Sequence, residues 1–315
     1  MTAPLAAGSV SLRLYPHDDL DAPAIVDELR AQAALAIAAG FDGVMTSEHH
    51  AGFPGYLPNP LQAAGWCLDA MDGGWAAPCP MLLPLRPTPL VAEDVAWLAA
   101  RFPGRVGVGV ASGALASDFE LVGQTSEGLA TRFAAQLEEL AGVLSGRAPG
   151  ALRDDPAVRR LARHPVPVVS AAMGLTAARR AARLGAGLLF DSLSTPERNR
   201  ELVDAYRAAG GTETCIAIRR AWVGEPPRSE VDAQIARYRS YSPSAAQARW
   251  GRDELVAEPD AGAVAEGLVE TVARAGATAV NLRVHVPGVT PAQVREQIER
   301  LGADVVGPLR ASLRG

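Results

Sequence analysis

The chain has 315 residues, 48% of them hydrophobic, and a formal net charge of −5 at pH 7. This length suits one large α/β barrel domain. The acidic balance gives no general attraction for nucleic acid or for anionic membrane surfaces. The three cysteines are widely spaced and form neither a disulfide framework nor a zinc pattern. No segment has the pattern of a signal peptide or of a membrane helix, so we expect a cytoplasmic protein.

Short apolar stretches typical of strands alternate along the chain with longer Ala-, Leu- and Arg-rich stretches typical of helices. The expected strands are Val10–Tyr15, Gly43–Ser47, Trp75–Leu83, Val106–Val110, Val166–Ser170, Gly187–Phe190, Thr214–Val223 and Thr278–Val286. The expected helices are Ala22–Ala39, Pro60–Met71, Thr88–Arg101, Glu127–Leu144, Thr176–Leu184, Pro196–Ala209, two stretches that end at Ala275, and Pro291–Leu301. Runs such as PVPVV and TAVNL are apolar on both faces, which indicates parallel strands under helical cover. The pattern predicts a (β/α)8 TIM barrel in a single domain over residues 1–315.

Two connections are long, Gly146–Pro165 and Gly224–Pro259, and we expect extended loops after strands 4 and 7. Long loops at a barrel mouth are where lids and binding surfaces lie, so Gly224–Pro259 is the expected lid. Its residues Tyr238, Tyr241 and Trp250 are interpreted as packing residues, with ligand contact as the alternative.

Adjacent histidines, His49 and His50, follow the second expected strand in the segment TSEHHAGFPGYLPNP. Alternation along the strand places Met45, Ser47 and His49 on one side, with His49 at the C-terminal mouth, where barrel enzymes carry their catalytic residues. Adjacent side chains point in opposite directions, so the pair is a poor chelate and no metal site is expected. For His49 a proton-transfer role and a structural role both stay open, and His50 is interpreted as structural.

Two glycine-containing segments suggest ligand contacts. GRVGVGVASG, residues 104–113, lacks the third glycine of a dinucleotide fingerprint because Ser112 stands in its place, and its glycines are interpreted as relieving crowding against a ligand. In SAAMGLTAARRAARLG, residues 170–185, the backbone N–H groups of Gly174–Thr176 and the Thr176 hydroxyl suit a phosphate at a helix N-terminus. A plain N-cap role explains Thr176 equally well.

Five segments resemble, in the correct order, the bacterial luciferase-like flavin monooxygenases. They are GFDGVMTSEHH with LPNP, LPLRPTPLVAEDVAWL, GRVGVGVASGALASDFELVG, PVPVVSAAMG, and PGVTPAQVREQIERLGADVV. The resemblance covers nearly the whole chain. It implies a (β/α)8 barrel that binds reduced flavin at its C-terminal mouth and is usually dimeric. It also implies a catalytic role for His49 and cofactor contacts from Cys79, Pro80, Ser112, Arg132, Met173, Gly174 and Thr176, with Arg132 and Ser112 at the phosphate.

The resemblance has further consequences at single positions. It implies a cis peptide at Cys79–Pro80 under the flavin ring. The sequence SEHH is typical of the flavin branch of the family rather than the deazaflavin (F420) branch, which favours FMN. Ala111 stands where luciferase has a reactive cysteine, so light emission is not implied. Ser112 stands where luciferase has a phosphate-binding arginine.

These features together predict a monooxygenase. Reduced FMN, supplied by a separate flavin reductase, would react with oxygen to a flavin hydroperoxide that oxidises a small organic substrate, with His49 handling protons. An F420-dependent dehydrogenase or reductase and a non-catalytic flavin-binding relative are the alternatives. The helices Pro60–Met71 and Thr88–Arg101 are rich in Ala, Leu and Trp, and we expect a homodimer through them.

Overall fold

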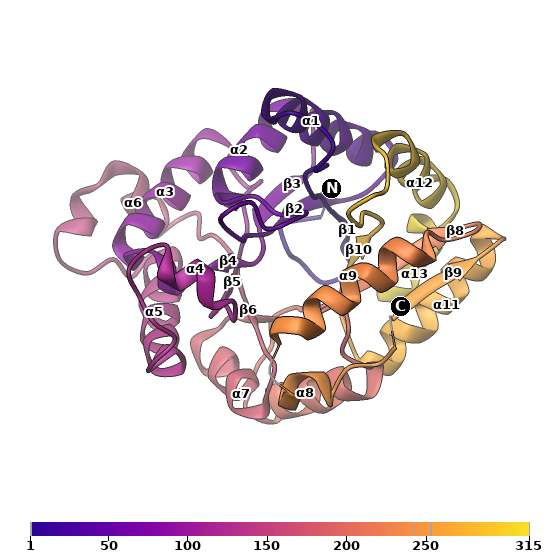
Figure 1. Ribbon diagram of the computed structural model, residues 1–315. Coiled ribbons are helices and arrows are strands. Elements are labelled where there is room, and N and C mark those ends of the chain that lie inside the picture. Colours follow the sequence, from indigo (N-terminus) through magenta and orange to yellow (C-terminus); the bar gives the residue numbers. More distant parts are fainter. Residues whose placement is uncertain (1, 243, 253, 315) are drawn as a thin grey trace.

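A computed structural model describes residues 2–242, 244–252 and 254–314, with a ring of helices around a central ring of parallel strands (Figure 1). The strands of the ring are β1 (Val10–Arg13), β2 (Gly43–Thr46), β3 (Trp75–Pro78), β4 (Met81–Leu82), β5 (Val108–Ala111), β6 (Val168–Ala171), β7 (Gly187–Leu189), β8 (Cys215–Val223) and β10 (Ala279–Arg283). The surrounding helices are α1 (Ala22–Ala38), α2 (Pro60–Ala70), α3 (Thr88–Arg101), α5 (Leu129–Leu144), α7 (Leu175–Leu184), α8 (Pro196–Ala208), α11 (Ala261–Ala275), α12 (Pro291–Asp304) and α13 (Val306–Arg314). The predicted α/β barrel is confirmed.

The ring closes through a strand that is divided in two. The hydrogen-bonded order is β3-β2-β1-β10-β8-β7-β6-β5-β4, and every pairing in it is parallel. β3 and β4 are separated only by Cys79-Pro80, and a parallel bridge between Ala76 and Val106 joins β3 to the chain just before β5. β3 and β4 therefore form the third of the eight expected strands.

Several helices begin where the sequence supplies an N-cap side chain followed by proline. Asp21, Asn59, Thr195 and Thr290 each accept a hydrogen bond from a backbone N–H of the first turn, and a proline occupies the first or second helical position. Such residues satisfy donors that have no partner within the helix. These caps fix where each helix begins and therefore how the loop before it leaves its strand.

The two long connections lie at different places. Gly146–Pro165 leads from α5 into β6 and contains η2 (Gly150–Asp154) and α6 (Pro156–Arg160), which packs against α3. It precedes a strand, so it does not extend the barrel mouth. After β5 the mouth carries a short helix that was not expected, α4 (Ala116–Glu120).

The second long connection follows β8, as expected. It contains α9 (Arg228–Tyr241), α10 (Ser244–Gln247) and β9 (Leu255–Glu258), and α9 crosses in front of the strands in Figure 1. β9 pairs in parallel with the end of β8, Arg220 opposite Leu255 and Val223 opposite Glu258. The segment therefore returns to the strand from which it departs.

Side chains inside the barrel form a core separate from the one between strands and helices. The inner cluster is Leu5, Met45, Trp75, Ala77, Cys79, Val169, Leu189, Ile216, Ile218 and Ala279. A Cβ atom at Gly107 would lie 2.8 Å from the Leu5 side chain, and one at Gly109 only 2.1 Å from Cys79 Sγ. These two glycines make room for Leu5 and Cys79, so interpreting them as relieving crowding against a ligand was wrong.

In the part of the chain that the structure describes, no helix is both long and apolar enough to cross a bilayer.

Candidate functional site

A cavity of about 460 Å³ lies at the carboxyl ends of the barrel strands. This volume is within the range of small-molecule and cofactor sites. The residues that line it come from nearly every strand end and from the β8–β9 connection: Arg13, Tyr15, Ser47, Glu48, His49, Tyr56, Pro80, Leu82, Ala111, Ser112, Gly113, Ala114, Ala171, Met173, Leu189, Phe190, Asp191, Ser192, Leu193, Ile218, Tyr238, Tyr241, Ser242, Ala246, Trp250 and Arg283. The mouth of a barrel is the place where the predicted chemistry was expected.

His49 is held at the cavity wall by a carboxylate. Its Nδ1 lies 2.7 Å from Oδ2 of Asp118, which comes from α4 and is fully buried. The other Asp118 oxygen accepts the backbone N–H of His50 at 3.0 Å. A carboxylate at Nδ1 keeps the proton on that nitrogen and leaves the Nε2 lone pair for a ligand. The imidazole is therefore oriented as a proton acceptor or donor toward the cavity.

Aromatic rings enclose the same imidazole. The ring centroids of Phe53 and Tyr56 lie 4.7 and 4.5 Å from that of His49, and Tyr241 of α9 lies 6.5 Å away. Only 14% of the His49 side chain is exposed. Proton transfer at Nε2 would therefore take place in a largely water-excluded environment.

His50 belongs to a different network. Its Nε2 lies 2.8 Å from Oε1 of Glu48, and the buried Glu48 carboxylate also accepts the backbone N–H of Leu82 at 2.7 Å and pairs with Arg86. His50 does not line the cavity. This geometry supports the structural interpretation of His50, because its contacts tie the loop after β2 to the start of η1 (Leu83–Leu85).

The peptide bond Cys79–Pro80 is cis, which confirms that prediction. The Pro80 ring lines the cavity, while Cys79 is buried beneath it, and the Cys79 carbonyl accepts a 2.7 Å hydrogen bond from Arg13 Nη1. Burial raises the pKa of the Cys79 thiol to about 11, against a smaller lowering by Arg13. The thiol is protonated at neutral pH and is not a nucleophile.

The residues predicted around a phosphate lie mainly near the ends of β5 and β6. Ser112 and Met173 line the cavity, and Gly174 is the N-cap of α7, which has no side-chain cap. Thr176 is the second residue of α7 and is exposed, so the N-cap alternative for it was wrong. The Met173 carbonyl accepts hydrogen bonds from Arg198 at 3.1 Å and from Arg249 at 2.9 Å.

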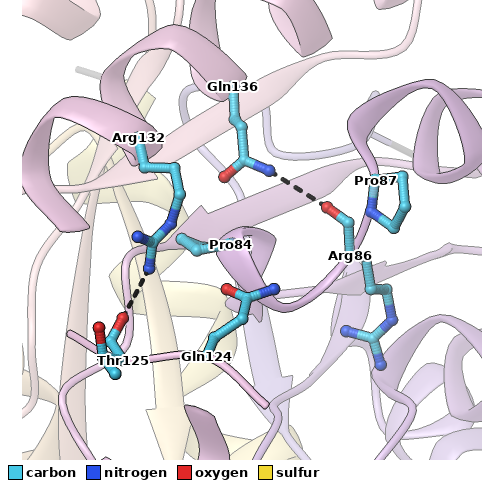
Figure 2. A pocket seen from close by; sticks show the side chains of 7 residues that line it. All are labelled: Pro84, Arg86, Pro87, Gln124, Thr125, Arg132 and Gln136. Carbon is cyan, nitrogen blue, oxygen red and sulfur yellow. Dashed lines mark hydrogen bonds between the residues drawn. The ribbon is translucent and has the colours of Figure 1, made fainter. Parts of the chain in front are cut away.

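Arg132 lies apart from the other predicted site residues. It lines a separate hollow between η1 and α5, shown in Figure 2, and does not line the cavity that contains His49. Its guanidinium donates hydrogen bonds of 2.9 Å to the carbonyl oxygens of Thr125 and Glu127. In this arrangement Arg132 holds the loop before α5, and its predicted contact with a phosphate stays a prediction.

The adjacent strands β1 and β10 contribute a polar part of the site that was not predicted. The side chains on the inner side of these strands, and of the residues that directly follow them, are Ser11, Arg13, Tyr15, Asn281, Arg283 and His285, all buried. Arg13 Nε donates to Asn281 Oδ1 at 2.8 Å, and Asn281 Nδ2 donates to Ser11 Oγ at 2.9 Å. The signal was present in the sequence, because SLRLY and NLRVH each place an arginine between apolar residues of an expected strand.

Tyr238, Tyr241 and Trp250 from the β8–β9 connection also reach the cavity, so the alternative of ligand contact is the one that the structure favours. The hydroxyl groups of Tyr238 and Tyr56 are 2.8 Å apart. α9 therefore closes the mouth on the side of β1 and β10.

The lining of the cavity fits a flavin. Pro80, Leu82, Ala111 and Ile218 give the cavity apolar walls, as an aromatic ring system requires. Ser47 Oγ and Trp250 Nε1, both lining residues, are buried without a hydrogen-bond partner among the described residues. Buried polar atoms are normally satisfied, so a bound ligand is a natural partner for them. The Ser112 hydroxyl and the uncapped N-terminus of α7 are donors suited to a phosphate.

The family model described as luciferase-like monooxygenase matches residues 10–306. No protein of curated function matches the sequence significantly.

Solved structures share the fold at low sequence identity. The monooxygenase RslO1 from Streptomyces bottropensis is 17% identical, with a TM-score of 0.74 over 95% of this chain and 99% of that one. The oxygenating constituent of 3,6-diketocamphane monooxygenase from Pseudomonas putida, solved with FMN, is 16% identical, with a TM-score of 0.73 over 96% and 98%. The F420-dependent tetrahydromethanopterin reductase from Methanopyrus kandleri is 14% identical, with a TM-score of 0.66 over 96% and 99%.

Proposed function

The chain belongs to the luciferase-like monooxygenase family, and from this premise we propose that it is a monooxygenase that uses reduced FMN and oxygen to oxidise a small organic substrate. The observation that carries the proposal is His49, oriented by Asp118 at the wall of a cavity that is partly formed by Pro80 of the cis peptide.

The residues of the chain have separable tasks in this proposal. Bound reduced flavin supplies the electrons for the reaction with oxygen. Pro80 and Leu82 would support its ring, and Ser112 with the N-terminus of α7 would hold its phosphate. His49 Nε2 would give a proton to the substrate or take one from it, which is a task that imidazole performs near neutral pH. Phe53, Tyr56 and Tyr241 keep water away from that proton.

The choice of FMN over F420 rests on the sequence SEHH. Solved structures of the same fold include one in complex with FMN and one described as F420-dependent, so the fold is compatible with both cofactors. An F420-dependent dehydrogenase or reductase is the second candidate. A non-catalytic flavin-binding protein is the third, supported by Ser112 in place of a phosphate-binding arginine.

One experiment separates the three candidates. Purified protein is titrated anaerobically with reduced FMN and, in parallel, with reduced F420, and each complex is then mixed with oxygenated buffer while oxygen consumption is recorded. We expect FMN to bind more tightly and its complex to consume oxygen with kinetics different from those of free reduced FMN. Preferential binding of F420 would favour the dehydrogenase or reductase. Binding of FMN without any change in oxygen kinetics would favour the non-catalytic relative.

We propose two protein partners. The first is a separate flavin reductase, which would supply the reduced FMN that the proposed reaction consumes. The second is another copy of the chain, bound through α2 and α3. Trp97 and Leu90 of α3 are 54% and 56% exposed, so both side chains are accessible to a second copy. A dimeric mass in solution that becomes monomeric on Trp97→Glu would support this interface, and a monomeric wild-type mass would refute it.

A further inference from the structure

Arg283 is a buried cation with unused hydrogen-bonding capacity. Its side chain extends from β10 into the cavity, and the residue is only 3% exposed. Nη2 donates to the Tyr238 hydroxyl at 2.9 Å, and Nε donates to the His285 carbonyl at 3.3 Å. Nη1 has no hydrogen-bond partner within residues 2–242, 244–252 and 254–314. A guanidinium carries five N–H donors in a planar fork, so part of this fork is available to a ligand.

The positive charge at this end of the cavity is not neutralised by a carboxylate. Neither Arg283 nor its neighbour Arg13 forms a salt bridge to any acidic side chain in the described part of the chain. Arg13 is 2% exposed and uses its donors on Asn281, Cys79 and Met45. Removing a charge from water is costly unless an opposite charge or strong hydrogen bonds replace the solvent. Two buried cations that line one cavity therefore favour an anion within it.

The surrounding side chains are those that recognise an organic anion. The Arg283 guanidinium carbon lies 4.4 Å from the ring centroid of Tyr15 and 5.7 Å from that of Tyr238. The Tyr238 hydroxyl, which accepts from Arg283, is also hydrogen-bonded to Tyr56, whose ring contacts His49. Hydroxyl donors, aromatic walls and a guanidinium together suit the charged end of a partly apolar molecule.

The titration of neighbouring groups agrees with a positive potential here. Burial alone would raise the pKa of Tyr15, but Arg283 and Arg13, with a hydrogen bond to Tyr56 and a smaller effect of Arg220, more than offset it and lower the pKa below its ordinary value. Burial, with repulsion from His17 and Arg283, lowers the pKa of His285 well below its ordinary value, so His285 stays neutral. The arginines are therefore the source of the positive charge.

We propose that Arg283, together with Tyr15 and Tyr238, forms a subsite for the oxyanion of an organic substrate, a carboxylate or a sulfonate. It determines specificity, because in the ring of strands β2, which leads to His49, separates β1 and β10 from β4 and β5, and because Tyr238 of α9 contacts Arg283. The substrate assignment rests on the proposed monooxygenase function. The anion subsite itself rests only on Arg283 and its surroundings.

The test compares ligands of matched shape with and without the charge. Benzoate with benzamide, and benzenesulfonate with benzenesulfonamide, are titrated into the full chain without flavin at pH 7 by calorimetry. We expect each anion to bind about ten- to a hundredfold more tightly than its neutral partner, as charge-assisted hydrogen bonds provide. The tighter anion identifies carboxylate or sulfonate as the preferred class. Equal affinity of the charged and neutral partners overturns the proposal.

Variants of Arg283 show whether this residue causes the tighter binding of the anions. Arg283→Met should abolish the difference in affinity between the anion and its neutral partner, and Arg283→Lys should retain part of that difference. The matched control is Arg219→Met, which removes a buried arginine of β8 that donates to the Ser194 and Ile218 carbonyls and does not line the cavity. The control should keep the full preference. If Arg283→Met does not fold, Arg283→Lys alone decides. Loss of most of the preference for the anion over its neutral partner in Arg283→Lys supports the assignment to Arg283. An unchanged preference in that variant contradicts a role for the planar guanidinium.

FMN affinity is measured on the same proteins, so that failure of the anion subsite can be distinguished from failure of the proposed monooxygenase function. Arg283→Met should change FMN affinity by less than about twofold, whereas an equal loss for FMN and for the anions would place Arg283 in the flavin site and overturn the subsite. If wild-type protein binds the anions selectively but binds no FMN, the subsite stands and the proposed function fails.

Discussion

The two ends of the cavity are lined by different kinds of chemical group. At the carboxyl ends of β5 and β6 the ligand-facing groups are a serine hydroxyl, small side chains and the backbone of an uncapped helix N-terminus. Between β1 and β10 they are arginines and tyrosines buried among one another. Backbone donors remain when side chains change, whereas the second end depends on particular side chains. Under the proposed function, the first end would hold the cofactor, which a family shares, and the second the substrate, which differs between members.

His49 lies between these two ends, and its loss should have the largest effect on turnover. His49→Ala should still fold and bind FMN, yet lose substrate oxidation by roughly 10²- to 10⁴-fold, as expected for a positioned acid–base group. His50→Ala is the control and should lose much less, because its ring pairs with Glu48 and does not itself line the cavity. Steady-state oxidation rates with saturating reduced FMN measure both. Equal losses of oxidation rate in the two variants would contradict a catalytic role for His49.

Asp118 should affect turnover mainly through His49, because its Oδ2 holds the imidazole while its Oδ1 accepts the backbone N–H of His50. Asp118→Asn replaces a charge-assisted hydrogen bond by a neutral one, and we expect kcat to fall roughly ten- to a hundredfold while KM stays nearly constant. Glu120→Gln, an exposed position on the same short helix, is the matched control and should be neutral. A rise in KM with an unchanged kcat would assign Asp118 to substrate binding at one end rather than to proton transfer between them.

Gly109 tests how tightly the barrel interior below the cavity is packed. Gly109→Ala would place a methyl group 2.1 Å from Cys79 Sγ and should cost about 1–3 kcal/mol of unfolding free energy, as overpacking does. Gly142→Ala within α5 meets no atom within 4 Å and should stabilise by about 1 kcal/mol or less. Chemical denaturation of both variants gives the difference. Similar unfolding free energies of the two variants would mean that β5 can move away from Cys79 at no cost.

Arg132 should give the smallest effect if backbone donors dominate the phosphate end. In the structure its guanidinium binds two loop carbonyls, so Arg132→Ala should change FMN affinity by no more than about threefold, and riboflavin affinity equally. The family resemblance predicts instead a far greater loss for FMN than for riboflavin, which lacks the phosphate. Fluorescence titration of both flavins decides between the two.

The sequence predicted features that depend on local pattern. The barrel follows from alternating apolar strands and helices, and the position of His49 follows from strand alternation and motif. Asp118 was missed because a five-residue helix leaves no periodic signal and its contact with His49 spans 69 positions. Arg13 and Asn281 meet across 268 positions only because the ring closes between β1 and β10. An inward-facing arginine in each of these strands was readable, but what it would face was not.

Because β9 pairs with the end of β8, the segment between these two strands can be replaced as a unit. Both ends of the excursion between Val223 and Leu255 are fixed on one strand, so its length can change without moving the barrel. Closing a flexible loop costs only about 0.6 kcal/mol more for each doubling of its length. Evolution or an engineer can therefore lengthen, shorten or graft this excursion at modest thermodynamic cost. Replacing it would change Tyr238, Tyr241 and Trp250 at once while leaving the strand ends below it in place.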